Sequence, residues 1–255
     1  MMQMTYARLL RSFAPDKIFV ITNVAYREIA KSQLPDLMDE NLLLEPVRKN
    51  TAPCIAYAGH KILSIDTNSS VIITPSDHMI LREEQYDKAV QKALKVVQKR
   101  DIIVTLGIRP TRPDTGYGYI QYMEDVEEDG VFKVKTFVEK PPLDMATTFY
   151  QSGDFLWNAG IFISNVRTLL NAYHHYLPEV NDLFKEIKKV YNTSGEKEFV
   201  AKAFSMCPNV SIDTAIMEKA KNVCVIPAQF GWSDLGTWAS LYEQYQKDYL
   251  GNAVS

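Results

Sequence analysis

Short apolar runs alternate with amphipathic segments along this chain, and this alternation limits the fold more than any other feature. The runs at 17–22, 71–74 and 102–108 have the length and composition of buried strands. Between them, residues 53–65 and 83–99 place apolar side chains at helical spacing. Strands that alternate with helices predict a largely parallel sheet covered by helices on both faces.

The second half of the chain is less regular, but it continues the same theme. Strands are predicted at 132–138, 155–164 and 223–226. Helices are predicted at 166–176, 178–191, 196–204, 212–220 and 235–248. No stretch rich in Gly, Ser or Pro separates these elements. The sequence therefore predicts one α/β domain over residues 1–250, with a Rossmann-like mixed, mostly parallel sheet.

Composition and charge exclude several classes of function. A chain of 255 residues, 46% of them hydrophobic, can bury a sizeable core. A formal net charge of -3 gives no general attraction to nucleic acid or to an acidic membrane surface. No apolar run approaches the ~20 residues of a membrane span. Three cysteines without CxxC spacing favour a reducing, cytoplasmic setting over a disulfide framework or zinc site.

Six polar clusters lie beside the predicted strands and helix starts. They are EPVRKNTAP at 45–53, TPSDH at 74–78, TGYGYI at 115–120, FVEKP at 137–141, WNAGIF at 157–162 and GWSDLGTW at 231–238. A carboxylate after a buried strand, such as Asp77, suits a hard cation. Glu139 can accept hydrogen bonds from sugar hydroxyls, and Lys140 can meet a phosphate. Asn158 offers both donors and acceptors to a pair of hydroxyls.

Each cluster also has a purely structural interpretation. Thr51, Asp77 and Asp234 are residue types that cap helices and turns. Glu139 and Lys140 could form a surface ion pair, which contributes little stability. The two glycines of TGYGYI do not make a dinucleotide fingerprint, because Gln121 stands where the third glycine would fall. Taken one at a time, the clusters leave both interpretations open.

Taken together and in this order, the six clusters resemble the mannose-1-phosphate guanylyltransferase family, a group of sugar-1-phosphate nucleotidylyltransferases. The resemblance covers residues 1–250 and implies a sheet of the nucleotide-diphospho-sugar transferase type. It also implies a reaction in which mannose 1-phosphate attacks the α-phosphorus of GTP, giving GDP-mannose and pyrophosphate. Catalysis of this kind consists mainly of positioning and charge neutralisation.

The resemblance assigns roles to particular residues. Asp77 and Asp234 would hold Mg²⁺ between the phosphates, and Lys140 would contact the sugar phosphate, so these three are the expected catalytic residues. The nucleotide would lie near Arg48, Asn50 and Thr51. The mannose would contact Gly118, Glu139 and Asn158. Asp213 also stands at a family position; it receives no role, and we expect it to cap the helix that follows.

Both ends of the sequence depart from the family pattern. The family begins with a strand and a glycine-rich loop that wraps the triphosphate, whereas residues 1–6 resemble the helix after that loop. Residues 251–255 resemble the entry to a C-terminal extension, of which they would be a stub. We therefore expect a sheet without the first strand, and a chain that has little or no transferase activity by itself.

Three other functions are weighed against this one. A non-catalytic sugar-nucleotide-binding protein would be expected to lose the metal carboxylates, yet Asp77 and Asp234 are both present. A nucleotidyltransferase for another hexose 1-phosphate remains open, because sugar choice depends on pocket shape. A glycosyltransferase with an Asp-x-Asp metal pair is disfavoured, since no two aspartates stand two residues apart. The sequence also leaves open whether the chain forms a homodimer.

Overall fold

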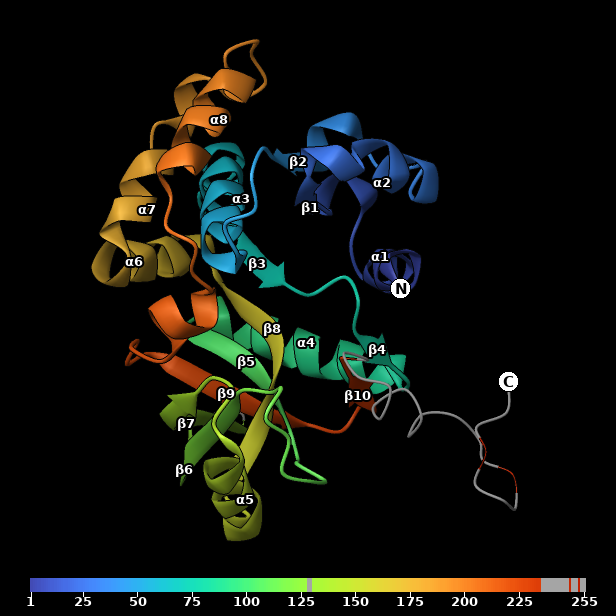
Figure 1. Ribbon diagram of the computed structural model, residues 1–255, viewed down its shortest axis with the longest axis vertical. Coiled ribbons are helices and arrows are strands. Elements are labelled where there is room, and N and C mark those ends of the chain that lie inside the picture. The colour runs from blue at the N-terminus through green and yellow to red at the C-terminus, as the bar shows by residue number, and fades with distance from the viewer. Residues whose placement is uncertain (128–129, 235–247, 249–251, 253–255) are drawn as a thin grey trace.

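The computed structural model describes residues 1–127, 130–234, 248 and 252 (Figure 1). The helix predicted at 235–248 and the stub predicted at 251–255 lie outside the described residues, apart from Asp248 and Asn252. None of the described helices combines the length and apolar character that crossing a membrane requires.

Six strands form the central sheet. In spatial order they are β3 (Ser70–Ile73), β8 (Phe155–Asn165), β5 (Ile103–Ile108), β9 (Val223–Ala228), β7 (Val131–Val138) and β6 (Tyr119–Glu127). The predicted α/β fold with a mixed sheet is confirmed, but its parallel share is smaller than expected. Of the described pairs in this sheet only β5–β9 is parallel, because β8 runs antiparallel between β3 and β5.

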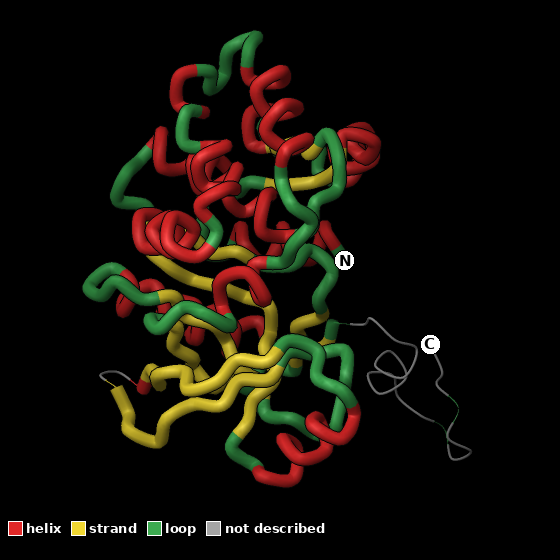
Figure 2. Tube along the Cα trace, turned by 60° about the vertical axis from the view of Figure 1, so that its left-hand side comes forward, coloured by secondary structure: helices red, strands yellow, loops and turns green. Residues whose placement is uncertain are grey.

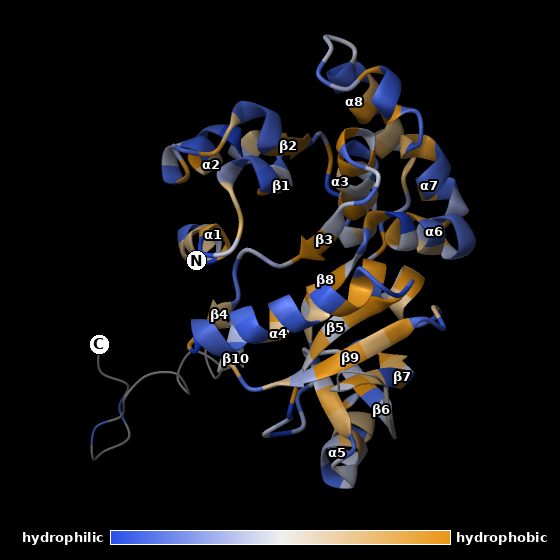
Figure 3. Ribbon diagram, turned by 180° about the vertical axis from the view of Figure 1, so that it is seen from behind, coloured by the Kyte–Doolittle hydropathy of each residue, from blue (hydrophilic) through white to orange (hydrophobic). Residues whose placement is uncertain are grey.

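Helices cover both faces of this sheet, as the alternation predicted. On one face, α3 (Thr51–Ile65), α6 (Val166–Tyr176), α7 (Pro178–Phe184) and α8 (Glu196–Met206) pack in one apolar cluster. The other face is covered by α4 (Glu83–Val97) and, lower in Figure 1, α5 (Leu143–Ser152). Consecutive strand residues serve opposite faces: Ile103 joins the first cluster and Val104 the second. Figure 3 shows the apolar strands and the polar outer face of α4.

The predicted helices and strands agree with the structure within a few residues, with two exceptions. Helix α6 has the predicted bounds, and α3 begins two residues before the predicted 53–65. The segment predicted as one helix at 178–191 is α7 followed by a 3-10 turn, Ile187–Lys189. In place of a helix at 212–220 there is a single π-helical turn, Asp213–Met217.

The N-terminal residues form a small unit with its own core. It contains α1 (Met2–Leu10), β1 (Val20–Asn23), α2 (Arg27–Gln33) and β2 (Leu42–Glu45), packed around buried side chains that include Tyr6 and Leu37. Strand β1 pairs in parallel with β2 alone, and β3 pairs with β8 alone among the described strands. Both strands therefore have one unpaired edge in the part of the chain that the structure describes.

A two-stranded antiparallel ribbon joins two segments far apart in the sequence. Strand β4 (Met79–Ile80) pairs with β10 (Trp232–Ser233). The amides of Leu81 and Arg82 extend this link by donating to the carbonyl of Phe230 at 3.2 and 2.9 Å. The ribbon lies at the end of the central sheet in both Figure 1 and Figure 2. It brings the chain beside Asp77 next to the chain that leads to Asp234.

Candidate active site

A bulge in β8 places the side chain of Asn158. Between Thr105 and Gly107 of β5, the register on β8 moves from Phe162 to Asn158, so β8 has two extra residues there. The bulge contains Gly160, whose φ of +68° is rarely adopted by other residues. The amide oxygen Oδ1 of Asn158 accepts from Thr105 Oγ1 at 2.9 Å and from Gly160 N at 3.1 Å. These two bonds fix which way the amide points.

The nitrogen end of the same amide reaches Asp213. Asn158 Nδ2 donates to Asp213 Oδ1 at 3.0 Å, and Asp213 begins the π-helical turn that stands in place of the predicted helix. Burial raises the pKa of Asp213, which the bond from Asn158 and the positive charge of Lys140 oppose. The expectation that Asp213 caps a helix is therefore incomplete, because its carboxylate points at a proposed sugar-binding residue.

Gly118 and Glu139 are packed against each other beside Asn158. A Cβ on Gly118 would lie 2.6 Å from Glu139 Oε2 and 3.3 Å from the Cβ of Asn158, so a larger residue here would displace the Glu139 carboxyl. The Gly118 carbonyl accepts a hydrogen bond from the backbone N–H of Asn158 at 2.8 Å. The three residues expected to contact mannose therefore lie together. They come from three places in the chain: Gly118 directly precedes β6, Glu139 directly follows β7, and Asn158 lies in β8.

The charge around Glu139 is strongly negative. Burial, followed by the charge of Asp213, raises the pKa of Glu139 to about 7, while Lys140 lowers it. Lys140 Nζ lies 3.5 Å from Glu139 Oε1, and its side chain remains 62% exposed. Lys140 has a φ of +48°, which is uncommon for a residue with a side chain. An exposed ammonium group thus stands at the rim of a buried acidic cluster.

His78 is close enough to both carboxylates predicted to hold the metal for their charges to act on it. Its pKa is lowered by burial, and the charges of Asp77 and Asp234 act in the opposite direction. Asp77 Oδ1 is 3.9 Å from His78 Nε2, whereas Trp232 Nε1 donates to His78 Nδ1 at 3.1 Å. Asp234 Oδ1 accepts from the hydroxyl of Tyr117 at 2.9 Å. The ring contacts of His78 and Tyr117 with Trp232 complete this arrangement.

Asp77 and Asp234 offer carboxylate oxygens, the ligand type that a hard divalent cation takes. Mg²⁺ usually takes one or two carboxylates and completes its shell with water and substrate phosphates. Asp77 has a side chain that is 76% exposed and therefore accessible to such a ligand. Among the described residues, no three His, Cys, Asp or Glu side chains gather into a complete protein cage. Two carboxylates without such a cage fit an ion that is shared with a substrate.

The segment expected to bind the nucleotide is tied to the Asp213 segment. Asn50, with a φ of +66°, caps α3 by accepting from Thr51 N at 2.8 Å, so the predicted capping role of Thr51 is wrong. The hydroxyl of Thr51 instead accepts from Ile212 N at 2.9 Å. Arg48 turns toward the N-terminal unit, where its guanidinium donates to the hydroxyl of Tyr26 and lies over the ring.

Glu45 is a buried acid near this segment that the sequence did not single out. Its Oε1 is buried without a hydrogen-bond partner. Burial raises the pKa of Glu45 to about 7, and the charge of Arg48 partly offsets this. A pattern of residue types could not reveal Glu45, His78 or Tyr117, because their environment comes from strands distant in sequence. Asp213 was identified as a family position, but its hydrogen bond with Asn158 was not predicted from the sequence.

Comparison with known proteins places this site in a family. The family model described as "Nucleotidyl transferase" matches residues 1–250. The chain belongs to the nucleotidyl transferase family. Among curated relatives of this nucleotidyl transferase, a mannose-1-phosphate guanylyltransferase of Escherichia coli is 34% identical over 100% of this chain and 56% of that protein. One from Salmonella montevideo is 37% identical over 100% of this chain and 55% of that protein.

Solved structures agree with the sequence relatives. A structure from Thermus thermophilus titled mannose-1-phosphate geranyltransferase aligns with a TM-score of 0.84 and 27% identity, covering 97% of this nucleotidyl transferase and 69% of that chain. A Helicobacter pylori structure titled mannose-6-phosphate isomerase gives 0.75 and 25%, covering 91% and 89%. The predicted resemblance to mannose-1-phosphate guanylyltransferases is confirmed. The chain spans about half the length of the curated relatives that it matches.

Proposed function

We propose that this chain carries the sugar-binding and metal-binding parts of a mannose-1-phosphate guanylyltransferase site. The reaction would join GMP from GTP to mannose 1-phosphate and release pyrophosphate. The observation that carries the proposal is the convergence of Gly118, Glu139 and Asn158, from three separate regions, on one acidic cluster with Lys140 at its rim. The sugar named in the curated relatives supports mannose.

Each polar group in the cluster has a defined task in this proposal. The carboxyl of Glu139 and the amide of Asn158 would bond to sugar hydroxyls, with Gly118 leaving room for the ring. The exposed ammonium of Lys140 would attract the sugar phosphate and hold it near the nucleotide. Because Asn158 is fixed by Thr105 and Gly160, its remaining donor is preorganised for the ligand.

A magnesium ion on Asp77 and Asp234 would neutralise phosphate charge as it develops in the transition state. Tyr117 and His78 would hold the two carboxylates in place through the contacts described above. Arg48, Asn50 and Thr51 would border the nucleotide, with Thr51 linked to the sugar site through Ile212.

The test separates binding from turnover. Calorimetry with GDP-mannose should detect binding, and Asn158→Ala should weaken it at least tenfold. Asn171→Ala, at an exposed position on α6, is the matched control and should leave affinity unchanged. GDP-glucose measured in parallel reports the sugar preference. A folded chain that does not bind GDP-mannose, or whose affinity is unaffected by Asn158→Ala, contradicts the assigned sugar site.

A pyrophosphate-release assay with GTP, mannose 1-phosphate and Mg²⁺ provides the second measurement. Robust turnover by the 255-residue chain would show that the expectation of low activity is wrong. GDP-mannose binding without turnover would support the proposed partial site. That outcome would also fit a non-catalytic sugar-nucleotide-binding protein, which is the alternative function. Turnover by a chain extended upstream, abolished by Asp77→Asn, would then decide for the enzyme.

A further inference from the structure

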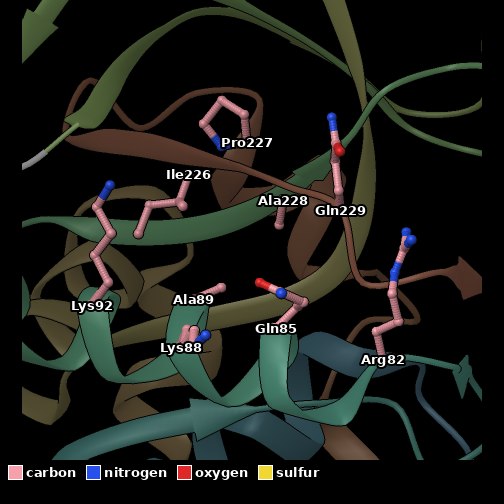
Figure 4. A pocket seen from close by; sticks show the side chains of 9 residues that line it. All are labelled: Arg82, Gln85, Lys88, Ala89, Lys92, Ile226, Pro227, Ala228 and Gln229. Atoms are coloured by element: carbon pink, nitrogen blue, oxygen red, sulfur yellow. The ribbon is translucent and has the colours of Figure 1, made fainter.

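A groove outside the candidate active site lies between α4 and the end of β9. It encloses about 410 Å³, and three of its lining residues are the cations Arg82, Lys88 and Lys92 (Figure 4). Figure 4 shows Lys92 of α4 at one end and Arg82, the residue just before α4, at the other, both extending toward the β9 side. No acidic side chain is among the described residues that line it.

The positive charge continues along the helix. A second hollow of about 400 Å³ adjoins the groove and is lined by Lys88, Gln91, Lys92 and Lys95. Lys88, Lys92 and Lys95 are spaced four and three residues apart, so they form one row about 10 Å long on the helix surface. Like charges at this spacing destabilise a helix by about 0.2–0.5 kcal/mol per pair. The row therefore works against the stability of α4.

Of the three acidic residues of α4, Glu84 stands four residues before Lys88, and the other two are engaged elsewhere. Glu83 and Asp87 lie on the side that faces α1, where they form ion pairs with Arg11 at 2.9 and 3.1 Å. On the groove side, Lys92 Nζ donates to the backbone carbonyl of Gly130 at 3.3 Å. Lys88 and Lys92 thus line a hollow to which the described residues contribute no carboxylate.

The rest of the lining indicates the class of ligand. Ala89, Pro227 and Ala228 provide a small apolar surface between the cations. The amides of Gln85 and Gln229 can donate to and accept from a polar ring edge. We propose that this groove is a second binding site, for a nucleoside diphosphate or a nucleotide of similar length. Its phosphates contact Lys88 and Lys92, and its ring lies on Pro227 and Ala228.

The groove is connected to both carboxylates of the candidate metal site by backbone bonds. Arg82 and Gln229 line the groove, and the amide of Arg82 donates to the carbonyl of the next residue, Phe230, at 2.9 Å. The β4–β10 ribbon begins directly beyond this bond and separates it from Asp77 and Asp234 by only a few residues. A ligand in the groove would stabilise this bond and, through it, the position of the two carboxylates.

Calorimetry with ADP in the presence of EDTA tests the binding site. Without a divalent ion, the carboxylates of the candidate metal site repel phosphate, so binding there is suppressed. The double variant K88Q/K92Q should weaken ADP binding at least tenfold. K197Q/K202Q removes two exposed lysines of α8 and should have no effect. Inorganic pyrophosphate should bind more weakly than ADP, since it lacks the ring.

Three results would overturn the proposal: no ADP binding, equal weakening in both double variants, or pyrophosphate that binds as tightly as ADP. Circular dichroism and thermal melting establish that K88Q/K92Q is folded; removing like charges should make it no less stable. Hydrogen exchange supplies the test of coupling. ADP should slow exchange at the amides of Leu81 and Arg82 in the wild type but not in K88Q/K92Q, and unchanged exchange contradicts the coupling.

The outcome is independent of the proposed transferase function. Asn158→Ala should lose GDP-mannose affinity while it retains ADP binding in the groove. K88Q/K92Q should show the reverse pattern when GDP-mannose is measured with Mg²⁺. Failure of one site therefore leaves the result for the other intact.

Discussion

The orientation of Asn158 and the protonation of Glu139 are set by contacts within the protein itself. Asn158 uses its amide oxygen twice and its amide nitrogen once within the protein. Glu139 is held in a buried position where its charged form is disfavoured. A group with a pKa near neutrality can change its charge when a cation or a phosphate enters. Glu139 is therefore sensitive to whatever occupies the neighbouring space.

The raised pKa of Glu139 predicts a pH-dependent stability. A folded-state pKa of about 7, against 4.5 for the free side chain, means that the folded protein binds more protons between these values. The free energy of unfolding should therefore fall as pH rises through this window. Glu139→Gln should be more stable than wild type at pH 8 by up to about 3 kcal/mol, at about 1.4 kcal/mol per pKa unit.

Urea denaturation at pH 5 and pH 8 measures this effect. Glu139→Gln should differ little from the wild type at pH 5 and exceed it at pH 8. Glu218→Gln, which replaces a nearby acid that bonds to the Glu139 backbone amide at 3.0 Å, is the control for lost negative charge alone. An equal gain at both pH values would show that titration of Glu139 is not the cause.

At the residue scale, the order of the motifs predicted which residues share a site, but it did not predict which side chains contact each other. The resemblance assigned Gly118, Glu139 and Asn158 to one ligand, and the structure brings them together. No local pattern indicated that Asp213 meets Asn158, because 55 residues separate them. The same holds for Tyr117 and Asp234, which are 117 residues apart. The sequence gives the chemical type of each side chain, but it does not give the distant residue that bonds to it and orients it.

The bulge in β8 is the element on which the candidate site depends. Two extra residues let Asn158 face Thr105 and let Gly160 approach Pro75 and His78. The period-two pattern of a strand breaks at this point, which explains the interrupted apolar pattern in the sequence. Helices with one buried face, such as α6, were predicted to the residue. The order of strands was not, since β8 is apolar on both faces and such a strand can pair anywhere in a sheet.

Two glycines with similar backbone angles allow the bulge to be tested. Gly160 and Gly153 have φ values of +68° and +78°, so alanine strains both by about 1–3 kcal/mol. A Cβ at Gly153 meets nothing within 4 Å, whereas one at Gly160 lies 3.4 Å from Pro75 and 3.6 Å from His78. Gly160→Ala should therefore alter the His78–Trp232 contact and change tryptophan fluorescence. Gly153→Ala should lower the thermal midpoint without that change.

A buried arginine connects the N-terminal unit to α4 of the main domain. The side chain of Arg8 on α1 is 2% exposed and lies 3.4 Å from Glu83 of α4. Its guanidinium is 5.6 Å from the centre of the Tyr86 ring, and two of its nitrogens have no hydrogen-bond partner. Arg11, which also pairs with Glu83, is 44% exposed. The two arginines pair with the same glutamate, but one side chain is buried and the other is exposed.

This difference in depth predicts different effects on stability. Arg8→Ala leaves a cavity where the arginine side chain was buried, and large-to-small changes at buried positions cost about 2–5 kcal/mol. Arg11→Ala removes an exposed partner and should cost at most about 1 kcal/mol. Thermal unfolding of both variants measures the comparison. Equal losses would mean that α1 is not anchored to α4 through Arg8.

Strand β8 sets the order in which the molecule can assemble. It pairs with β3, β5 and β6, whose residues begin at 70, 103 and 119, yet β8 itself ends only at residue 165. Pairing of this kind closes long loops, and chains rich in such contacts fold slowly. During synthesis, β3 and β5 must remain without their shared partner until β8 leaves the ribosome. Substitutions that weaken β8 should therefore reduce the yield of soluble protein by more than their effect on equilibrium stability alone.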